Sequence, residues 1–293
     1  MTDTRNGVLS VIGASFLYGI MPVFTKRVLL EGLSSNALVF NRFFFTAVFA
    51  LIICILAKIS LRVSRRQLVE LIFAAVIGYG LTASLLTVSY SLIPVGLATM
   101  FHFTNPLFVT LTMILLFREK PTFFKMVSCI FAVIGLVLMA DFSAMAPKGV
   151  IFATLSGMTY AFYVILNKKG SIAELNNFVI IFYVGTINSI FFGIRNMAIG
   201  DFHFPPNLLS FVLMAVIALF CTICALYLLT YGIRTLGAST AAVLNMIEPI
   251  VSLFAGMIVY HDLVGLKSLF GCRFIVASGI VVVLDRTRST EGQ

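Results

Sequence analysis

The chain repeats its own pattern halfway along, and this repeat constrains the fold more than any other feature. Pro106 lies in the sequence HFTNPLF and Pro249 lies in NMIEPIV, each in the middle of a long apolar run, at an offset of 143 residues (249 − 106). Near the start of each copy, Tyr18 aligns with Tyr160 at an offset of 142 (160 − 18). The chain therefore consists of two related halves.

Each half contains five apolar segments, so we predict two five-helix repeats, residues 1–142 and 143–293, within one integral membrane domain. The segments are about 17 to 24 residues long, enough to cross a hydrocarbon core ~30 Å thick. An odd number of spans in each half gives the halves opposite orientations, which is the inverted repeat of secondary transporters. The ten predicted transmembrane helices are residues 7–25, 37–57, 68–89, 95–117, 122–140, 149–166, 177–199, 208–231, 238–260 and 266–284.

The composition independently indicates an all-α membrane protein. Hydrophobic residues make up 60% of the chain and charged residues 11%, and the mean hydropathy is +1.09. Backbone polar groups in lipid must be satisfied within their own segment, so the apolar runs should be helices. The first run matches residues 149–166, and we therefore expect a retained helix there rather than a signal peptide.

The distribution of positive charge predicts the topology. Of the 20 Lys and Arg residues, 13 fall on the side of the termini and 7 on the other side, which favours cytoplasmic termini in a multi-pass protein of the inner (plasma) membrane. We interpret the net charge of +9 as membrane orientation and contact with lipid headgroups, so membrane lipid is an expected partner and nucleic acid is not.

Motifs for catalysis and for cofactors are absent from the sequence. It has no GxxxxGK[ST] phosphate loop, no HExxH and no GxSxG, so we predict no enzyme activity and no cofactor. Cys221 and Cys224 have the CxxC spacing but no His or acidic residue nearby, so no metal site is predicted. An intramembrane enzyme and a lipid-interacting scaffold remain the alternatives from other classes of protein.

The two central prolines point to a binding site. A proline inside a helix removes one N–H and frees the carbonyl four residues earlier, which here belongs to His102 or Asn245. Broken helices at corresponding places in two halves indicate a site near the membrane midplane. Alternatively, the kinks at Pro106 and Pro249 only shape the bundle.

Glu248 is the only acidic residue deep in a predicted span, and its repeat partner is Asn105. A charged acid in the membrane must be protonated, paired or in contact with water. Glu248 could therefore carry a coupling proton, pair with a cationic substrate, or remain a neutral acid bonded to backbone.

Aromatic and small residues complete the predicted site. Tyr18 and Tyr160 could face the bundle centre and line a cavity for an amphiphilic solute or an organic cation; ordinary packing is the alternative. Each lies beside two small residues four positions apart, which allow close helix contact within one chain or in a homodimer. These pairs are Ser15 with Gly19 and Gly157 with Ala161. The predicted substrate-binding residues are Tyr18, His102, Asn105, Tyr160, Asn245 and Glu248.

Lysines close the first span of each half. Lys26 and Lys168 would ordinarily extend to the headgroups, and a gating role is the alternative. Arg42, early in the second span, is interpreted as an interfacial anchor or as a contact at the external mouth. Possible coupling or gating is thus assigned to Glu248, Lys26 and Lys168.

The segments SFLYGIMPVFTKR, GLATMFHFTNPLF and GASTAAVLNMIEPIVSLFAGMIVYHD together resemble the EamA type of the drug/metabolite transporter superfamily over nearly the whole chain. The Glu248-Pro249 pair and Asp262 match the pattern of that family. The chain departs from it at Tyr18, where tryptophan is frequent, and at His261-Asp262, where Gly-Glu is common.

The resemblance implies ten helices around a central cavity and alternating access between the halves. Members are mostly exporters of amino acids, metabolites or amphiphilic compounds, and some import nutrients. We therefore predict a secondary transporter and exporter of a small organic solute. An uncoupled facilitative carrier or an importer is the alternative.

Overall fold

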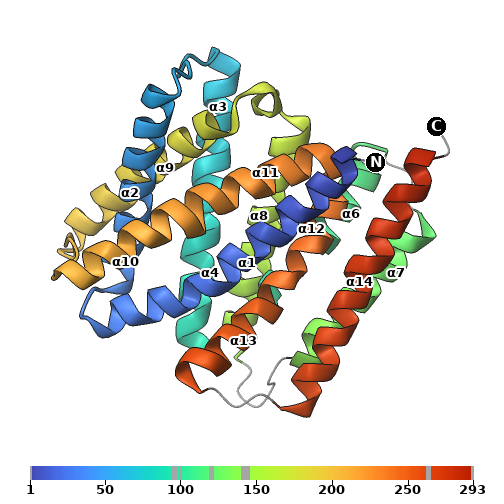
Figure 1. The fold of residues 1–293 in the computed structure, drawn as a ribbon. Helices are drawn as coiled ribbons and strands as arrows, with labels where there is room; N and C mark the ends of the chain where they lie inside the picture. Colours follow the sequence, from blue (N-terminus) through green and yellow to red (C-terminus); the bar gives the residue numbers. More distant parts are fainter. Residues whose placement is uncertain are drawn as a thin grey trace.

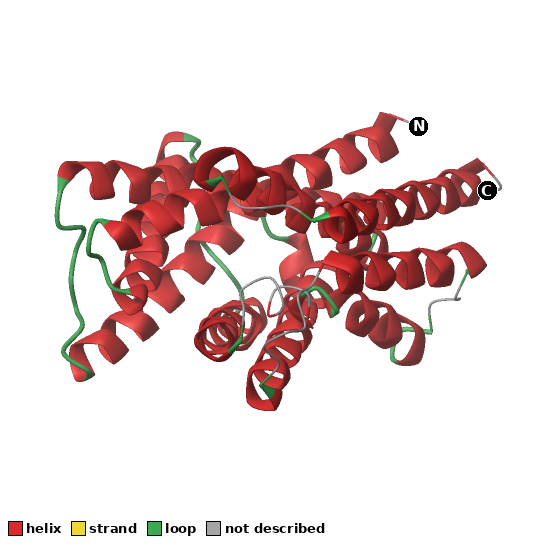
Figure 2. Ribbon diagram, turned by 90° about the horizontal axis from the view of Figure 1, so that it is seen from below, coloured by secondary structure: helices red, strands yellow, loops and turns green. Residues whose placement is uncertain are grey.

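The computed structural model describes residues 2–93, 98, 101–118, 122–139, 146–261 and 265–291, and its regular elements in these ranges are all helices (Figures 1 and 2). The first half contains α1 (Thr2–Leu30), α2 (Ser35–Leu56), α3 (Arg65–Phe73), η1 (Ala74–Leu81), α4 (Thr82–Leu92), α6 (Asn105–Leu115) and α7 (Phe123–Met139). The second half contains α8 (Pro147–Lys169), η2 (Ser171–Glu174), α9 (Asn177–Ala198), α10 (Leu208–Ala218), η3 (Leu219–Cys224), α11 (Ala225–Leu236), α12 (Ala238–Leu244), η4 (Asn245–Ile247), α13 (Glu248–Tyr260) and α14 (Leu266–Glu291).

Eight helical segments of the described chain are long and apolar enough to cross a membrane. Two shorter apolar helices, Asn105–Leu115 and Met126–Leu138, lie in the fourth and fifth predicted spans. The prediction of an all-α membrane protein is thus confirmed, while ten crossings and an inverted orientation of the halves stay predictions. The fourth predicted span is described at residue 98 and from residue 101 onward.

The third and eighth predicted spans are helices interrupted by a π-helical segment at corresponding positions. In the third span, η1 lies between α3 and α4, and in the eighth span η3 lies between α10 and α11. A π-helical turn widens the helix and frequently occurs at functional sites. The repeated sequence therefore folds in the same irregular way twice.

The fourth and ninth predicted spans are broken where the sequence places the prolines. Pro106 and Pro249 are each the second residue of a new helix, α6 or α13, where a missing backbone N–H costs little. The turn before α6 is closed by the Thr104 N–H donating to the Phe101 carbonyl at 3.3 Å. Before α13, the Glu248 N–H donates to the Asn245 carbonyl. The α-helical hydrogen-bond pattern is thus interrupted just before each proline, by turn residues before α6 and by the 3-10 segment η4 before α13.

The ends of these two broken spans also correspond. Arg118 follows α6 with φ of 52°, and His261 follows α13 with φ of 55°. This left-handed conformation commonly terminates helices. The acidic residues that follow them in the sequence, Glu119 and Asp262, lie outside the described residues.

Each half packs against the other in a reciprocal pattern. Helix α1 contacts α11 and α13 of the second half, while α8 contacts η1, α4 and α6 of the first half. Two further helices of the first half pair with their counterparts, α2 with α9 and α7 with α14 (Figure 1). The beginning of α1 and the end of α14 lie on the same side of the molecule in both views (Figures 1 and 2).

Small residues bring the first helix of each half against the broken span of the other half. A Cβ atom on Gly157 of α8 would lie 2.6 Å from the carbonyl oxygen of His102. A Cβ atom on Gly19 of α1 would lie 2.8 Å from the carbonyl oxygen of Glu248. In both places the helix approaches a backbone carbonyl so closely that any residue with a Cβ atom would displace it. Both contacts lie next to the interrupted part of the span.

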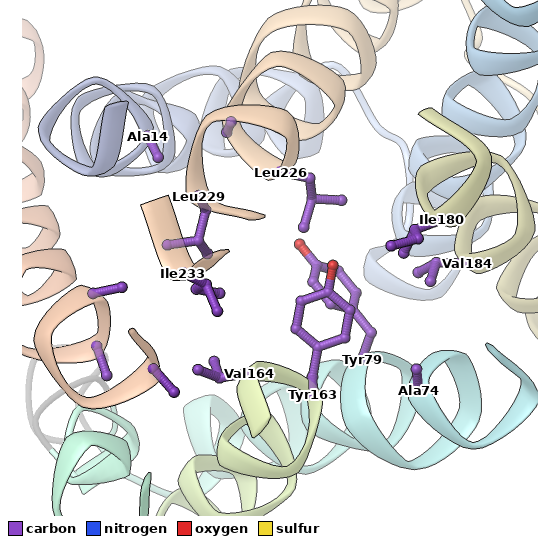
Figure 3. Packing of buried hydrophobic residues seen from close by; sticks show 14 of the residues in the cluster. Ala14, Ala74, Tyr79, Tyr163, Val164, Ile180, Val184, Leu226, Leu229 and Ile233 are labelled. Carbon is purple, nitrogen blue, oxygen red and sulfur yellow. The ribbon is translucent and has the colours of Figure 1, made fainter. Parts of the chain in front are cut away.

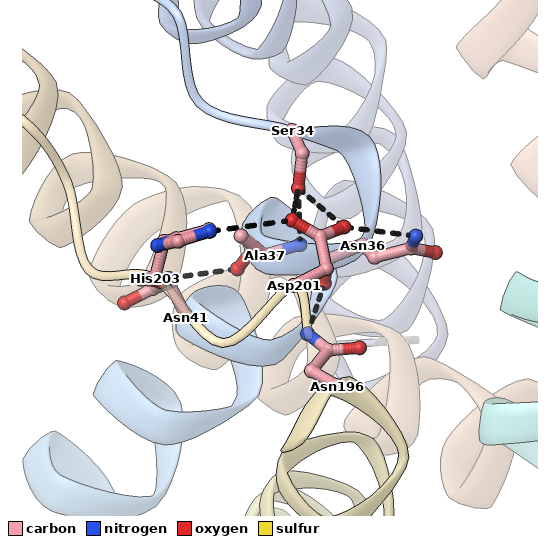
Figure 4. A network of polar contacts seen from close by, with 7 residues as sticks. All are labelled: Ser34, Asn36, Ala37, Asn41, Asn196, Asp201 and His203. Carbon is pink, nitrogen blue, oxygen red and sulfur yellow. Dashed lines mark hydrogen bonds and ion pairs between the residues drawn. The ribbon is translucent and has the colours of Figure 1, made fainter. Parts of the chain in front are cut away.

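Polar contacts tie the beginning of α2 to the segment after α9 (Figure 4). The Ser34 hydroxyl lies 2.8 Å from each carboxylate oxygen of Asp201, and Asn36 Nδ2 donates to the same carboxylate at 3.0 Å. Asn41 Nδ2 donates to the His203 carbonyl at 2.8 Å. These bonds hold α2, the helix that carries Arg42, in a defined position.

Candidate substrate cavity between the two halves

A cavity of about 120 Å³ lies between the halves, next to the breaks in the fourth and ninth predicted spans. Its lining includes five of the six predicted substrate-binding residues, namely Tyr18, His102, Tyr160, Asn245 and Glu248. Arg42 and Tyr79 also line it. Both halves therefore contribute polar side chains to one cavity.

Glu248 begins α13, so its carboxylate is near the positive end of the helix dipole, where negative charge is favoured. Asn245 Nδ2 donates to Glu248 Oε2 at 3.3 Å, and Asn245 Oδ1 lies 3.2 Å from the hydroxyl of Ser15 on α1. The side chains across this break form a short polar chain from α1 to the cavity. Its last member is an acid that is partly accessible to the cavity.

His102 is oriented by a hydroxyl of the other half. Its Nδ1 lies 2.9 Å from Ser156 Oγ, and that hydroxyl donates to the Ala153 carbonyl at 2.6 Å. Because the serine proton is used there, we assign the Nδ1–H of His102 as the donor, which leaves Nε2 of the neutral ring as an acceptor. The ring centroid lies 5.5 Å from that of Tyr160. His102 can therefore offer an acceptor beside an aromatic wall.

Asn105, the sixth predicted residue, does not line the cavity. Its side chain is 2% exposed, and its Nδ2 donates to the His102 carbonyl at 3.2 Å. Asn105 therefore stabilises the backbone before α6 from outside the cavity. The repeat partner of the acidic residue Glu248 thus has a different environment.

Arg42 is the site residue that sequence reasoning placed elsewhere. Its Nε donates to Thr222 Oγ1 at 3.0 Å, and its Nη2 donates to the Tyr79 hydroxyl at 3.1 Å. Tyr79 lies in η1 and Thr222 lies in η3, at the repeat offset of 143 residues (222 − 79). The arginine therefore bridges equivalent positions of the two halves. An arginine within a transmembrane helix is itself the signal that could have identified it.

A closed region of packed apolar residues lies next to Tyr79 of the cavity lining (Figure 3). Val184, Leu229 and Ile233 are at most 2% exposed. Tyr163 is fully buried among them, with its ring centroid 5.4 Å from that of Tyr79. Leu236 of α11 lies against Gly7, near the beginning of α1, which places this closed region toward the terminal side.

The two predicted gating lysines lie outside the cavity lining, in different surroundings. Lys26 Nζ lies 3.8 Å from the centroid of the Tyr260 ring, across the interface between α1 and α13. Lys168 Nζ donates to the Arg234 carbonyl at 2.5 Å, across the interface between α8 and α11. Lys26 therefore connects the first helix of the first half to the ninth predicted span, and Lys168 connects the first helix of the second half to the eighth.

Within the described residues, no group of three His, Cys, Asp or Glu side chains could hold a metal ion. Cys221 and Cys224, the CxxC pair, both lie in η3 as free thiols.

The fold defines a multi-helix membrane protein with a cavity between its halves. The model of the EamA-like transporter family matches the chain twice, over residues 5–140 and 147–284. The chain therefore belongs to the EamA-like transporter family.

Similar proteins are named as transporters. An S-adenosylmethionine uptake transporter of Rickettsia bellii (strain RML369-C) is 22% identical over 88% of this chain and 86% of its own length. The uncharacterized transporter YcbK of Bacillus subtilis (strain 168) is 31% identical over 45% of this chain and 44% of its own length. A solved crystal structure superposes with a TM-score of 0.81 over 97% of this chain and 98% of that chain, at 16% identity, which shows a shared fold.

Proposed function

We propose that this protein is a secondary transporter that moves a small organic solute by alternating access around the cavity. The solute is an amino acid, a metabolite, or an amphiphilic or cationic compound. The observation that carries the proposal is a single cavity lined from both halves, at the two corresponding helix breaks. The scaffold would be ten helices in two inverted repeats, residues 1–142 and 143–293.

The geometry supports a site that holds a solute at the junction of the halves. Glu248 offers a carboxylate, His102 an acceptor, and Tyr18 and Tyr160 aromatic surfaces on which a cation can rest. The apolar residues on the terminal side would separate when the cavity opens there. Lys26 lies at the interface between α1 and α13, which joins the two halves and would change in such a movement, and this is consistent with a gating role. Lys168 lies at the interface between α8 and α11, which both belong to the second half, so its gating role stays a prediction.

Two directions of transport compete. Export is the expectation from the resemblance of the sequence. Uptake is favoured by one specific observation, the name of the Rickettsia bellii relative as an uptake transporter. Glu248 would carry a coupling proton in either direction, or would pair with the solute in an uncoupled carrier.

Reconstitution into proteoliposomes tests the function. The measurement is the flux of labelled amino acids, amines, nucleosides and S-adenosylmethionine, with and without a pH gradient, for the wild-type protein and Glu248→Gln. We expect saturable flux of at least one solute that is lost in Glu248→Gln. Flux that is unchanged by a pH gradient would indicate an uncoupled carrier, and no flux of any solute would contradict the proposal.

We also propose a plasma-membrane location with both termini in the cytoplasm. Positive charge on the terminal side supports it. Protease accessibility of tags at both termini in intact cells tests it, because two protected tags are expected and a cleaved tag would overturn the orientation.

A further inference from the structure

The cavity contains one arginine whose equivalent in the other half is apolar. Helices α2 and α9 begin after the capping residues Ser34 and Asn176, which sets an offset of 142 residues (176 − 34). At this offset Arg42 corresponds to Val184, which is 1% exposed within the closed region. The repeated fold therefore does not itself require a cation at this position.

Arg42 contacts only neutral groups through its hydrogen bonds. Tyr79 and Thr222 hold the guanidinium from the two π-helical segments, and no ion pair of Arg42 occurs among the described residues. A cation within a membrane protein is expensive without an anionic partner. The held geometry and the remaining N–H donors therefore form a receptor for an anion, most favourably a carboxylate that accepts two parallel bonds.

Glu248 supplies the opposite charge in the same cavity. Its equivalent, Asn105, is neutral, so the acid is also peculiar to one half. The repeated fold therefore requires neither charged residue, and both Arg42 and Glu248 line the same cavity. A cavity with one cation and one acid is complementary to a solute that carries both charges.

We propose that Arg42 is a specificity-determining residue that binds the carboxylate of a zwitterionic solute, whose cationic group binds at Glu248. This inference rests on the proposed transport function and names the substrate class of that site. The volume of about 120 Å³ is somewhat smaller than an engineered cavity of ~150 Å³ that binds benzene. A compact zwitterion therefore fits the cavity best in the observed conformation.

Discrimination follows from the charge that each incomplete analogue leaves unpaired. An amine without a carboxylate leaves Arg42 without its anion, and a carboxylic acid without an amine leaves Glu248 without its cation. Sites built around a polar group reject analogues that lack it by factors far above tenfold. We expect at least about tenfold weaker binding of either analogue, since part of each charge stays hydrated.

Matched sets of three probes test this inference in nanodiscs and proteoliposomes. The sets are L-alanine with ethylamine and propionate, L-leucine with isopentylamine and 4-methylpentanoate, and L-phenylalanine with phenethylamine and 3-phenylpropionate. Thermal shift gives binding and labelled flux gives transport. For wild-type protein, we expect the zwitterion of at least one set to bind at least about tenfold more tightly than its analogues.

The variants should change the order of preference in opposite directions. Arg42→Gln should bind the amine at least as well as the zwitterion, and Glu248→Gln should favour the carboxylate. Arg42→Lys should recover part of the preference, since it restores the charge but not the planar fork. Arg273→Gln, which removes an exposed arginine of α14 outside the cavity lining, is the matched control and should keep the wild-type order.

The outcomes separate this inference from the transport function. Wild-type flux of neutral or singly charged solutes without preference for any zwitterion would overturn the role of Arg42 and leave transport intact. An order of preference that is unchanged in folded Arg42→Gln, as judged by size-exclusion chromatography, would overturn it too. Failure to move any of these probes, nucleosides or S-adenosylmethionine would overturn both proposals.

Discussion

The cavity and the closed region opposite it are built from equivalent parts of the two halves but have different chemistry. Arg42 lines the cavity, whereas its equivalent Val184 is 1% exposed and lies beside Ile180 in the apolar cluster (Figure 3). The backbone features correspond, because each half has a π-helical segment and a broken span. A few side chains thus turn one of two related regions into a polar site and the other into an apolar barrier.

The largest expected effect comes from giving the closed region the charge of the cavity. Val184→Arg would place an unpaired cation among apolar residues, which costs several kcal/mol. We expect loss of folded protein, measured as the monodisperse fraction in size-exclusion chromatography and as the melting temperature in detergent.

Val184→Ala is the control for this change, because it removes volume without adding charge and should destabilise less. If Val184→Arg melted at the wild-type temperature, the contrast between a polar cavity and an apolar closed region would be contradicted, since water would then reach this region.

The close backbone contacts around the breaks predict the next effect. Gly157→Ala would place its Cβ 2.6 Å from the His102 carbonyl oxygen, which must then move. We expect destabilisation of about 1–3 kcal/mol, the usual cost of overpacking, together with reduced flux, because His102 lines the cavity.

Gly265→Ala is the matched control, since nothing lies within 4 Å of its added Cβ. Equal melting temperatures for the two glycine variants would indicate that the contact between α8 and the fourth span is loose.

A smaller effect is expected at the interface of α1 with α13. Lys26→Gln removes the cation over the Tyr260 ring, an interaction worth about 0.5–1 kcal/mol at an exposed site. We expect a slightly lower melting temperature and altered flux, measured beside Lys267→Gln as an exposed control. Flux identical to wild type would argue against a gating role for Lys26.

The smallest effect concerns the polar network at the beginning of α2 (Figure 4). Hydrogen bonds from Ser34 and Asn36 lower the pKa of the Asp201 carboxyl below its usual value. A lowered pKa contributes stability above the usual value of about 3.9 and loses it as the pH falls through the lowered value.

Asp201→Asn should therefore reduce stability near neutral pH by a few tenths of a kcal/mol, because solvent screens the partly exposed carboxylate. The difference in melting temperature between the two proteins should narrow as the pH falls below about 4. A difference that is constant from pH 7 to pH 3 would contradict the role of the ionised carboxylate.

Much of the helical pattern could be predicted from the sequence. The predicted spans 177–199 and 238–260 agree closely with Asn177–Ala198 and with Ala238–Tyr260, which is interrupted at η4. Long apolar runs identify helices in lipid because backbone groups there must bond within the segment. The alignment of Pro106 with Pro249 also located both breaks.

The position of Arg42 could not be predicted in the same way. Its distance from the start of the helix suggested an interface, but its side chain faces Tyr79 and Thr222, which come from two other helices. Asn105 shows the converse. Its repeat symmetry with Glu248 predicted a substrate-binding residue, but its side chain bonds the His102 carbonyl and does not line the cavity. The π-helical segments carried no signal that the sequence analysis used.

The sequence by itself determined the apolar helices, their duplication and the places where two of them break, because these depend on composition and on local backbone chemistry. Only the tertiary structure decided which polar side chains share the cavity. The rotation of each helix about its axis is set by close contacts such as that of Gly157 with His102, between residues that are distant in the chain. Arg42 and Glu248 line one space because of that packing.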